Sequence, residues 1–211
     1  MTDSQKTDKD RDRWYLNLMA PRSRGDKYAW LDPSSAYINA ESFHAMLDDL
    51  LQPFCPGEID VVAGFDAAGF VLGAGMATRL KKGFLTIRKG GKIPVDFDRV
   101  PMSNYSGQTQ TMEMRKPAFA SGTRVLLVDQ WIETGGTMTA GIQLVERQKG
   151  IVAGIAAVCI EANTVTEAMY QRYKMSSCVV PGSDIQAQCN NQKLDSFNNF
   201  KPQDYFPEIG K

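Results

Sequence analysis

Residues 123–140 read TRVLLVDQWIETGGTMTA, and this stretch decides which fold the chain adopts. The apolar run at 123–128 predicts a buried strand, and a helix is predicted over 136–149, directly after the turn at 134–137. Glycines in that turn let the backbone approach an anion, and the unpaired N–H groups that begin a helix favour negative charge. Asp129 follows the strand, where nucleotide-binding turns place an acid that holds sugar hydroxyls. This pattern indicates a phosphate-binding turn. A glycine-rich connection between a strand and a helix that binds no ligand would show the same sequence pattern.

The alternation of strand and helix continues on both sides of this turn. Further strands are predicted at 59–64, 83–87, 151–160 and 177–180, and further helices at 40–54, 70–81 and 165–173. Strands that alternate with helices favour a parallel sheet with both faces covered. We therefore expect an α/β fold with a mainly parallel, twisted sheet flanked by helices. The polar stretch at 89–110 is interpreted as a long functional loop.

Composition excludes several classes of function. The 211 residues carry 24 basic and 24 acidic side chains, so the zero net charge makes no electrostatic case for a nucleic-acid or membrane partner. No apolar run approaches the roughly 18 residues of a membrane span, and the charged N-terminus lacks a secretion signal. The single histidine, His44, lies in an amphipathic helical pattern and is expected either at the surface or in helix packing. The four cysteines lack metal-binding spacing, which favours free thiols in a cytoplasmic protein.

Two stretches of the sequence resemble a known enzyme family. The run VLLVDQWIETGGTMTA resembles the phosphoribosyl-pyrophosphate (PRPP) motif of type I phosphoribosyltransferases. Residues 61–94, VVAGFDAAGFVLGAGMATRLKKGFLTIRKGGKIP, look like the matching stretch of adenine phosphoribosyltransferases in order and spacing. The resemblance covers roughly residues 40–165.

This resemblance implies the type I phosphoribosyltransferase fold, with a small N-terminal hood over the base at about 14–39. It implies transfer of ribose 5-phosphate from PRPP to an adenine-like purine base with release of pyrophosphate. It also implies Mg²⁺ carried mainly by PRPP or pyrophosphate, no metal ligands from the protein, and a homodimer. We accordingly expect a disordered segment at 1–13, a phosphoribosyltransferase domain at 14–182, and a C-terminal extension at 183–211 that packs on the domain or trails from it.

The resemblance also assigns roles to individual residues. The 5′-phosphate would be held by Thr134, Gly135, Gly136 and Thr137, and the ribose by Asp129 and Gln130. Pyrophosphate would be held by Asp66, Ala67, Ala68, Arg88, Lys89 and Lys92. The base and hood would involve Trp30, Leu31 and Trp131. The candidate catalytic residues are Glu133 and Asn104.

Several of these positions depart from the family pattern. Gln130 stands in place of a second acid, and Ala67-Ala68 in place of Ser-Arg in the pyrophosphate loop. Asn104 occupies the place of a glutamate in the lid, unless Glu113 is the true counterpart. Glu133 is either a general acid/base near the base N7 or a surface acid before a helix. Trp131 either forms a wall of the nucleotide pocket or caps the core.

Three functions remain open at this point. The first is an active phosphoribosyltransferase of the purine-salvage type. The second is a catalytically weakened relative that binds nucleotide or PRPP in a regulatory role. The third is an interaction protein that uses only the scaffold, although the basic stretch at 79–92 lacks the interleaved aromatics of nucleic-acid binders.

Overall fold

The computed structural model describes residues 13–20, 32–103 and 109–190. Chain contacts divide the protein into two units. Residues 47–188 form the larger unit, and the remaining residues at both ends of the chain form the other. In the second unit, Ser35 joins two short helices, because its hydroxyl donates to the Leu18 carbonyl at 2.6 Å and accepts from the Ala20 N–H at 2.8 Å. The predicted hood at 14–39 and the predicted segments at the two ends of the chain stay predictions.

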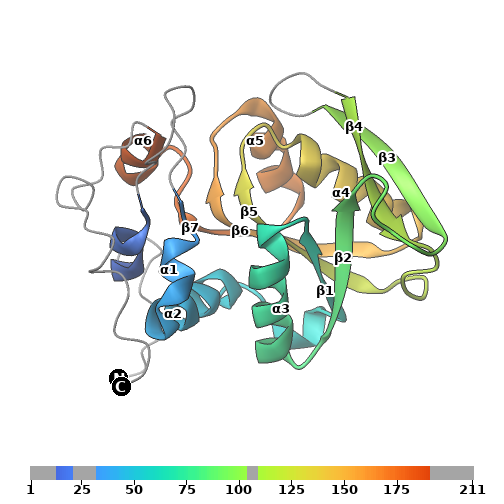
Figure 1. The fold of residues 1–211 in the computed structure, drawn as a ribbon, viewed down its shortest axis with the longest axis horizontal. Helices are drawn as coiled ribbons and strands as arrows, with labels where there is room; N and C mark the ends of the chain where they lie inside the picture. The colour runs from blue at the N-terminus through green and yellow to red at the C-terminus, as the bar shows by residue number, and fades with distance from the viewer. Residues whose placement is uncertain (1–12, 21–31, 104–108, 191–211) are drawn as a thin grey trace. The chain divides into compact units, whose positions relative to one another are not determined.

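A seven-stranded sheet with the order β3-β4-β2-β1-β5-β6-β7 organises the larger unit (Figure 1). The strands are β1 (Val61–Phe65), β2 (Gly83–Lys89), β3 (Phe97–Ser103), β4 (Thr109–Arg115), β5 (Arg124–Ile132), β6 (Ile151–Ile160) and β7 (Met175–Val179). Strands β1, β2, β5, β6 and β7 pair in parallel, while β3 and β4 form an antiparallel hairpin that joins the sheet beside β2. The predicted mainly parallel α/β architecture is therefore confirmed.

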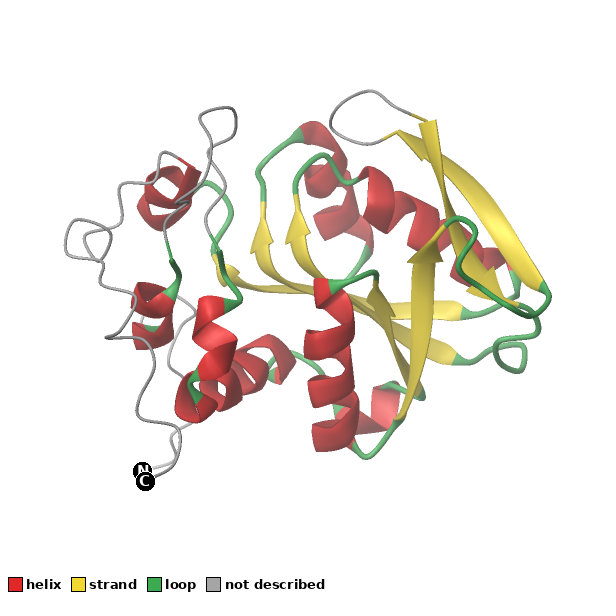
Figure 2. Ribbon diagram, viewed as in Figure 1, coloured by secondary structure: helices red, strands yellow, loops and turns green. Residues whose placement is uncertain are grey.

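Helices of the larger unit cover both faces of this sheet (Figure 2). The described helices of both units are α1 (Ser35–Ile38), α2 (Ala40–Leu51), α3 (Ala68–Leu80), α4 (Gly136–Arg147), α5 (Thr164–Arg172) and α6 (Asp184–Asn190), with 3₁₀ helices at Trp14–Leu18 and Pro56–Glu58. Strand residues alternate between the faces. Ala63, Phe65, Val125 and Leu127 accordingly share one core cluster with Met138 and Leu144 of α4.

The interpretation of 89–110 as a loop is wrong. All of β3 (Phe97–Ser103) and the first residues of β4, which begins at Thr109, fall within this range. Pro101 argued against a strand, since proline cannot donate to a ladder, but β3 is the edge strand, where proline is tolerated. Strand β5 also runs to Ile132, beyond the predicted end at 128, so that Asp129 lies inside it. Helix α6 was not predicted.

Other expectations from composition are confirmed. His44 is exposed on α2. All four cysteines are free, with Cys55 exposed and the other three buried. Among the described residues, no helix is long and apolar enough to cross a membrane.

Candidate active site at the carboxyl edge of the sheet

The turn between β5 and α4, residues 133–137, is the candidate phosphate loop. Gly135 has a φ of +82°, and a Cβ there would lie 2.7 Å from Val165 Cγ1, so both conformation and space require glycine. Helix α4 begins at Gly136, and the Thr139 hydroxyl donates to the Gly135 carbonyl at 2.8 Å. The Thr137 hydroxyl lies 3.5 Å from the Met102 sulfur of β3, so the hairpin approaches the loop. The four residues predicted to hold the 5′-phosphate therefore form one turn at the start of a helix.

Asp129 is half-buried beside the candidate phosphate loop. One oxygen of its carboxylate accepts from the Gln130 N–H at 2.7 Å. Burial raises the pKa of Asp129 to about 7, although that hydrogen bond and the charge of Lys89 act in the opposite direction. A Cβ on Gly69 would lie 2.6 Å from the Val128 carbonyl oxygen and 3.4 Å from the Asp129 carboxylate, so the turn after β1 packs closely against this acid. Close packing and the Gln130 N–H thus hold the acid in place.

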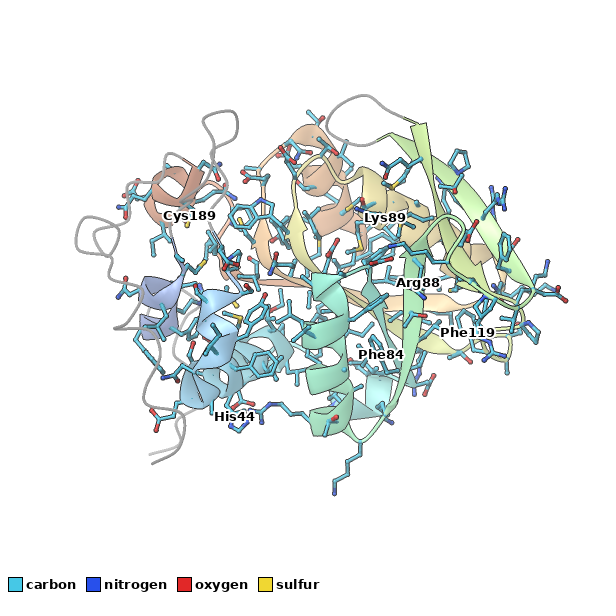
Figure 3. The ribbon with its side chains drawn as sticks, viewed as in Figure 1. His44, Phe84, Arg88, Lys89, Phe119 and Cys189 are labelled. Atoms are coloured by element: carbon cyan, nitrogen blue, oxygen red, sulfur yellow. The ribbon has the colours of Figure 1, made fainter. Side chains whose placement is uncertain are left out.

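Arg88 and Lys92 lie next to Asp66, and the charge of Lys89 also acts on this acid. We call these four residues the cationic cluster. The Lys92 ammonium lies 2.9 Å from the Asp66 carboxylate, and Arg88 Nε lies 3.8 Å from it. Burial acts to raise the pKa of Asp66, but Lys92, Arg88 and Lys89 together hold it below its usual range. Figure 3 shows Arg88 and Lys89 at the end of β2. The cluster brings the predicted pyrophosphate-binding cations to one point.

One donor of Arg88 lacks a hydrogen-bond partner among the described residues. One terminal nitrogen donates to the Lys92 carbonyl at 3.1 Å, and the guanidinium lies 6.0 Å from the centre of the Phe70 ring. Its buried Nε makes no hydrogen bond among the described residues. Ala67 and Ala68, at the start of α3, contribute only backbone groups and methyl groups, and the peptide bond between Asp66 and Ala67 is cis.

Glu113 has a structural place in the hairpin. It lies in β4 with 1% of its surface exposed. Its carboxylate accepts from the Gly91 N–H at 2.9 Å and pairs with Arg99 at 3.3 Å. Glu113 therefore anchors the turn that carries Lys92, and each of its two carboxylate oxygens has a partner in the hairpin or that turn.

Glu133 and Trp131 lie beside Glu161, which follows β6. The Trp131 indole N–H donates to the Glu161 carboxylate at 3.0 Å. Glu133 is exposed, yet partial burial and then the negative charge of Glu161 raise its pKa. A raised pKa makes a carboxylate a better proton acceptor, which fits the predicted acid/base role of Glu133. Of the remaining predicted site residues, Asn104, Trp30 and Leu31 lie outside the described residues.

Sequence reasoning missed two residues that contact the site. Glu161 binds Trp131, and the Asn163 side chain donates to the Glu133 carbonyl at 2.7 Å. Both residues follow the strand predicted at 151–160. This strand is parallel to β5, so the carboxyl ends of the two strands lie at the same edge of the sheet. The spacing of Asn163 and Thr166 before a helix is also a capping signal, and the structure forms that capping box.

Comparisons with known proteins agree with this geometry. The model of the phosphoribosyl transferase domain matches residues 42–196. Adenine phosphoribosyltransferase from Mesorhizobium japonicum is 44% identical over 121 residues, which are 57% of this chain and 65% of the relative. The enzyme of that name from Dinoroseobacter shibae is 42% identical over 125 residues, 59% of this chain and 69% of the relative. The aligned part therefore spans about two thirds of each relative's length.

Solved structures give the same result. The structure of adenine phosphoribosyltransferase from Rhodothermus marinus superposes with a TM-score of 0.69 and 30% identity. It covers 79% of this chain and 98% of that one. The sheet flanked by helices is thus the type I phosphoribosyltransferase fold. The matched residues include the β5–α4 turn, the turn after β1 and the hairpin, and the chain belongs to the phosphoribosyl transferase domain family.

Proposed function

We propose that this protein is a phosphoribosyltransferase of the purine-salvage type, which transfers ribose 5-phosphate from PRPP to an adenine-like base and releases pyrophosphate. One observation carries the proposal. The candidate phosphate loop follows β5 and the cationic cluster lies at the end of β2, and β1 pairs with both strands. Gly69, after β1, packs closely against Asp129 at the end of β5. PRPP has the same order of groups, because its ribose separates a 5′-phosphate from a pyrophosphate. Relatives named as adenine enzymes support the same substrate class and do not favour the regulatory alternative.

The 5′-phosphate end uses backbone donors. The N–H groups of residues 135–137 and the positive end of the α4 dipole face a bound phosphate, and the hydroxyls of Thr134 and Thr137 add donors. Asp129, and beside it Gln130, accept or share hydrogen bonds with the ribose hydroxyls. Ribose binding favours the ionised form of Asp129, because hydroxyl donors stabilise a carboxylate.

The pyrophosphate end uses side-chain cations. Lys92 and Arg88 exchange the Asp66 carboxylate for pyrophosphate oxygens, which carry more charge and suit several donors at once. Arg88 Nε, which is buried without a hydrogen bond in the described structure, gains a partner in the same step. Backbone groups of Ala67 and Ala68 line this end, where the family places an arginine side chain.

Proton transfer at the base is assigned to Glu133. A bond forms between a base nitrogen and C1 of the ribose, the bond from C1 to the pyrophosphate oxygen breaks, and pyrophosphate leaves with the electron pair. The base nitrogen loses a proton, which the Glu133 carboxylate accepts. Its raised pKa makes that transfer more favourable than it would be for an ordinary glutamate. Trp131, Trp30 and Leu31 are proposed to enclose the base, and Asn104 to lie in the lid.

The donor set also fits a magnesium ion that the substrate carries. The described residues contain no group of three or more His, Cys, Asp or Glu side chains that could hold a metal. Mg²⁺ keeps several waters and binds readily through substrate phosphates, so the ion would be carried mainly by PRPP or pyrophosphate. When bound, the ion would neutralise charge on the leaving pyrophosphate.

We further propose that the protein is a homodimer located in the cytoplasm.

An assay with PRPP, Mg²⁺ and a panel of bases tests the proposal. Adenine, hypoxanthine and guanine would be supplied separately, and the nucleoside monophosphate and pyrophosphate measured together. We expect product with adenine above the level with the other two bases. If no base yields a nucleotide although PRPP binds, the regulatory alternative is correct and the proposed function is wrong.

A further inference from the structure

The segment that follows β6 contacts the end of β5 once and the candidate phosphate loop twice. The Glu161 N–H donates to the Ile132 carbonyl at 2.9 Å. The Asn163 side-chain amide donates to the Glu133 carbonyl at 2.7 Å. Val165 then packs so closely against Gly135 that a Cβ on the glycine would meet it at 2.7 Å. The loop is therefore held from the side of α5 as well as by hydrogen bonds of its own turn and of the first turn of α4.

Asn163 links α5 to this loop through both atoms of its amide group. Its oxygen accepts from the N–H groups of Val165 at 2.9 Å and Thr166 at 3.1 Å, which caps the first turn of α5. These two donors require the oxygen to face the helix, so the nitrogen must face the Glu133 carbonyl. The partners of the amide therefore fix its orientation. A side chain that only has a capping oxygen could cap α5 but could not also donate to the Glu133 carbonyl.

The contact with Glu133 has a consequence for the adjacent donor. A trans peptide group is planar, and its N–H points opposite to its carbonyl. A hydrogen bond that draws the Glu133 carbonyl toward α5 therefore turns the Thr134 N–H away from α5. Among the described residues this N–H donates to no other group, so it stays free for a ligand.

We propose that Asn163 is a positioning residue for the 5′-phosphate, which acts by fixing the peptide plane between Glu133 and Thr134. The proposal rests on the proposed function, because it takes residues 134–137 as the phosphate site. Asn163 does not touch the phosphate itself. Its role is to hold the loop in the phosphate-binding geometry before the ligand arrives, so that binding need not order the loop.

Asn163→Ser is the decisive variant, because serine retains a capping oxygen but has no amide to reach Glu133. Thr166→Val is the matched control. It removes the other half of the capping box, in which the Thr166 hydroxyl accepts from the Asn163 N–H at 3.1 Å, but it leaves the amide of Asn163 in place. Asn163→Asp is unsuitable, since its charge would repel a phosphate directly.

Calorimetry with two probes separates positioning from general stability. The first probe is adenosine 5′-monophosphate, which carries the 5′-phosphate, and the second is pyrophosphate, which the cationic cluster is proposed to bind. We expect Asn163→Ser to weaken binding of the monophosphate about three- to tenfold, the effect of one hydrogen bond. Pyrophosphate binding should change less than twofold, and Thr166→Val should leave both affinities within twofold of the wild type. Thermal unfolding shows that both variants are folded.

The proposal is overturned if Asn163→Ser leaves monophosphate binding unchanged, weakens both ligands equally, or matches Thr166→Val. If the wild type binds neither probe, the proposed function fails instead. Hydrogen exchange then decides the role of Asn163. Faster amide exchange at 134–137 in Asn163→Ser than in Thr166→Val supports positioning, and equal exchange in the two variants contradicts it.

Discussion

The two ends of the candidate site, the phosphate loop at 133–137 and the cationic cluster around Asp66, prepare for an anion in opposite ways. The loop offers backbone N–H groups, and among the described residues no carboxylate accepts from them. Packing against α5 contributes to the shape of the loop. The cluster offers side-chain cations that are already paired, since Lys92 lies 2.9 Å from Asp66. Binding at the loop therefore engages backbone donors, whereas binding at the cluster replaces one side-chain partner with another.

This contrast predicts where the protein tolerates change. A loop that depends on backbone geometry fails when one residue alters that geometry, because no other group supplies the missing donors. A cluster of several cations loses only part of its attraction when one side chain is removed. We therefore expect single substitutions at the loop to have larger effects than single substitutions at the cluster, and the following variants test that order.

Gly135→Ala should have the largest effect. The new methyl group would adopt a φ of +82° and meet Val165 at 2.7 Å, so the loop must move. We expect kcat/KM for PRPP to fall about 1,000-fold, because the donors to the phosphate lose their alignment. Gly122→Ala is the matched control, since Gly122 has a φ of +83° but nothing within 4 Å of its Cβ position. The control should lose about 1 kcal/mol of stability and keep its activity. Equal activity of the two variants would show that loop geometry is not limiting.

Glu133→Gln should have the next largest effect, of about 100-fold on kcat with little change in KM, if Glu133 transfers the proton. The wild-type rate should rise with pH as this carboxylate ionises, with a midpoint above the usual range of glutamate, because burial and Glu161 raise its pKa. Glu161→Gln removes the neighbouring charge, so it should shift that midpoint to lower pH while Trp131 keeps a hydrogen-bond acceptor. A pH–rate profile that is unchanged in both variants would assign the proton transfer to another group.

The phosphate loop and the β3–β4 hairpin differ in how well the sequence predicts them. Residues 123–140 contain an apolar run, two glycines and a helix start, and these local signals predict a strand, a turn and a helix. The loop could therefore be recognised from the sequence alone. The hairpin could not be recognised as easily, because Pro101 excludes a central strand and only the sheet order reveals that β3 is an edge. The alternation of Val100 with Met102, and of Met112 with Met114, was the available signal, since all four are buried.

Contacts within the site depend on chain pairing that the sequence does not display. Lys92 and Asp66 are 26 residues apart and meet because β1 and β2 are parallel neighbours. Trp131 and Glu161 meet because β5 and β6 pair in a register that places Trp131 opposite Cys159. Composition indicated that cations and acids were present, but only the sheet topology shows which of them neutralise one another.

Lys92→Met should have a moderate effect. It removes one cation from the cluster but leaves Arg88 and Lys89, so we expect KM for PRPP to rise about tenfold and kcat to change less. Pyrophosphate inhibition should weaken in parallel, while inhibition by adenosine 5′-monophosphate should not. The effect should also shrink at high salt, because Lys92 is 46% exposed. A loss as large as that of Gly135→Ala would contradict the contrast between the two ends.

The smallest effects should appear in stability, and they should have opposite signs at the two acids. The pKa of Asp129 is raised to about 7, so between pH 4 and 7 the folded protein holds a proton that the unfolded chain releases. Wild-type stability therefore falls as pH rises through this range, and Asp129→Asn removes the penalty. We expect its unfolding midpoint to exceed that of the wild type by about 2–4 °C at pH 8 and by less at pH 5.

Asp66→Asn should behave in the opposite way. The pKa of Asp66 is lowered by its cations, so its stabilising contribution is complete above the ordinary aspartate pKa near 4 and is lost only as pH falls through the lower folded value. The variant should therefore melt below the wild type by a similar margin at pH 5 and at pH 8. Thermal scans at both pH values measure the two variants together. If Asp129→Asn also melts lower at both pH values, Asp129 is already paired in the free protein, and the distinction between an end that awaits its ligand and an end that exchanges partners does not hold.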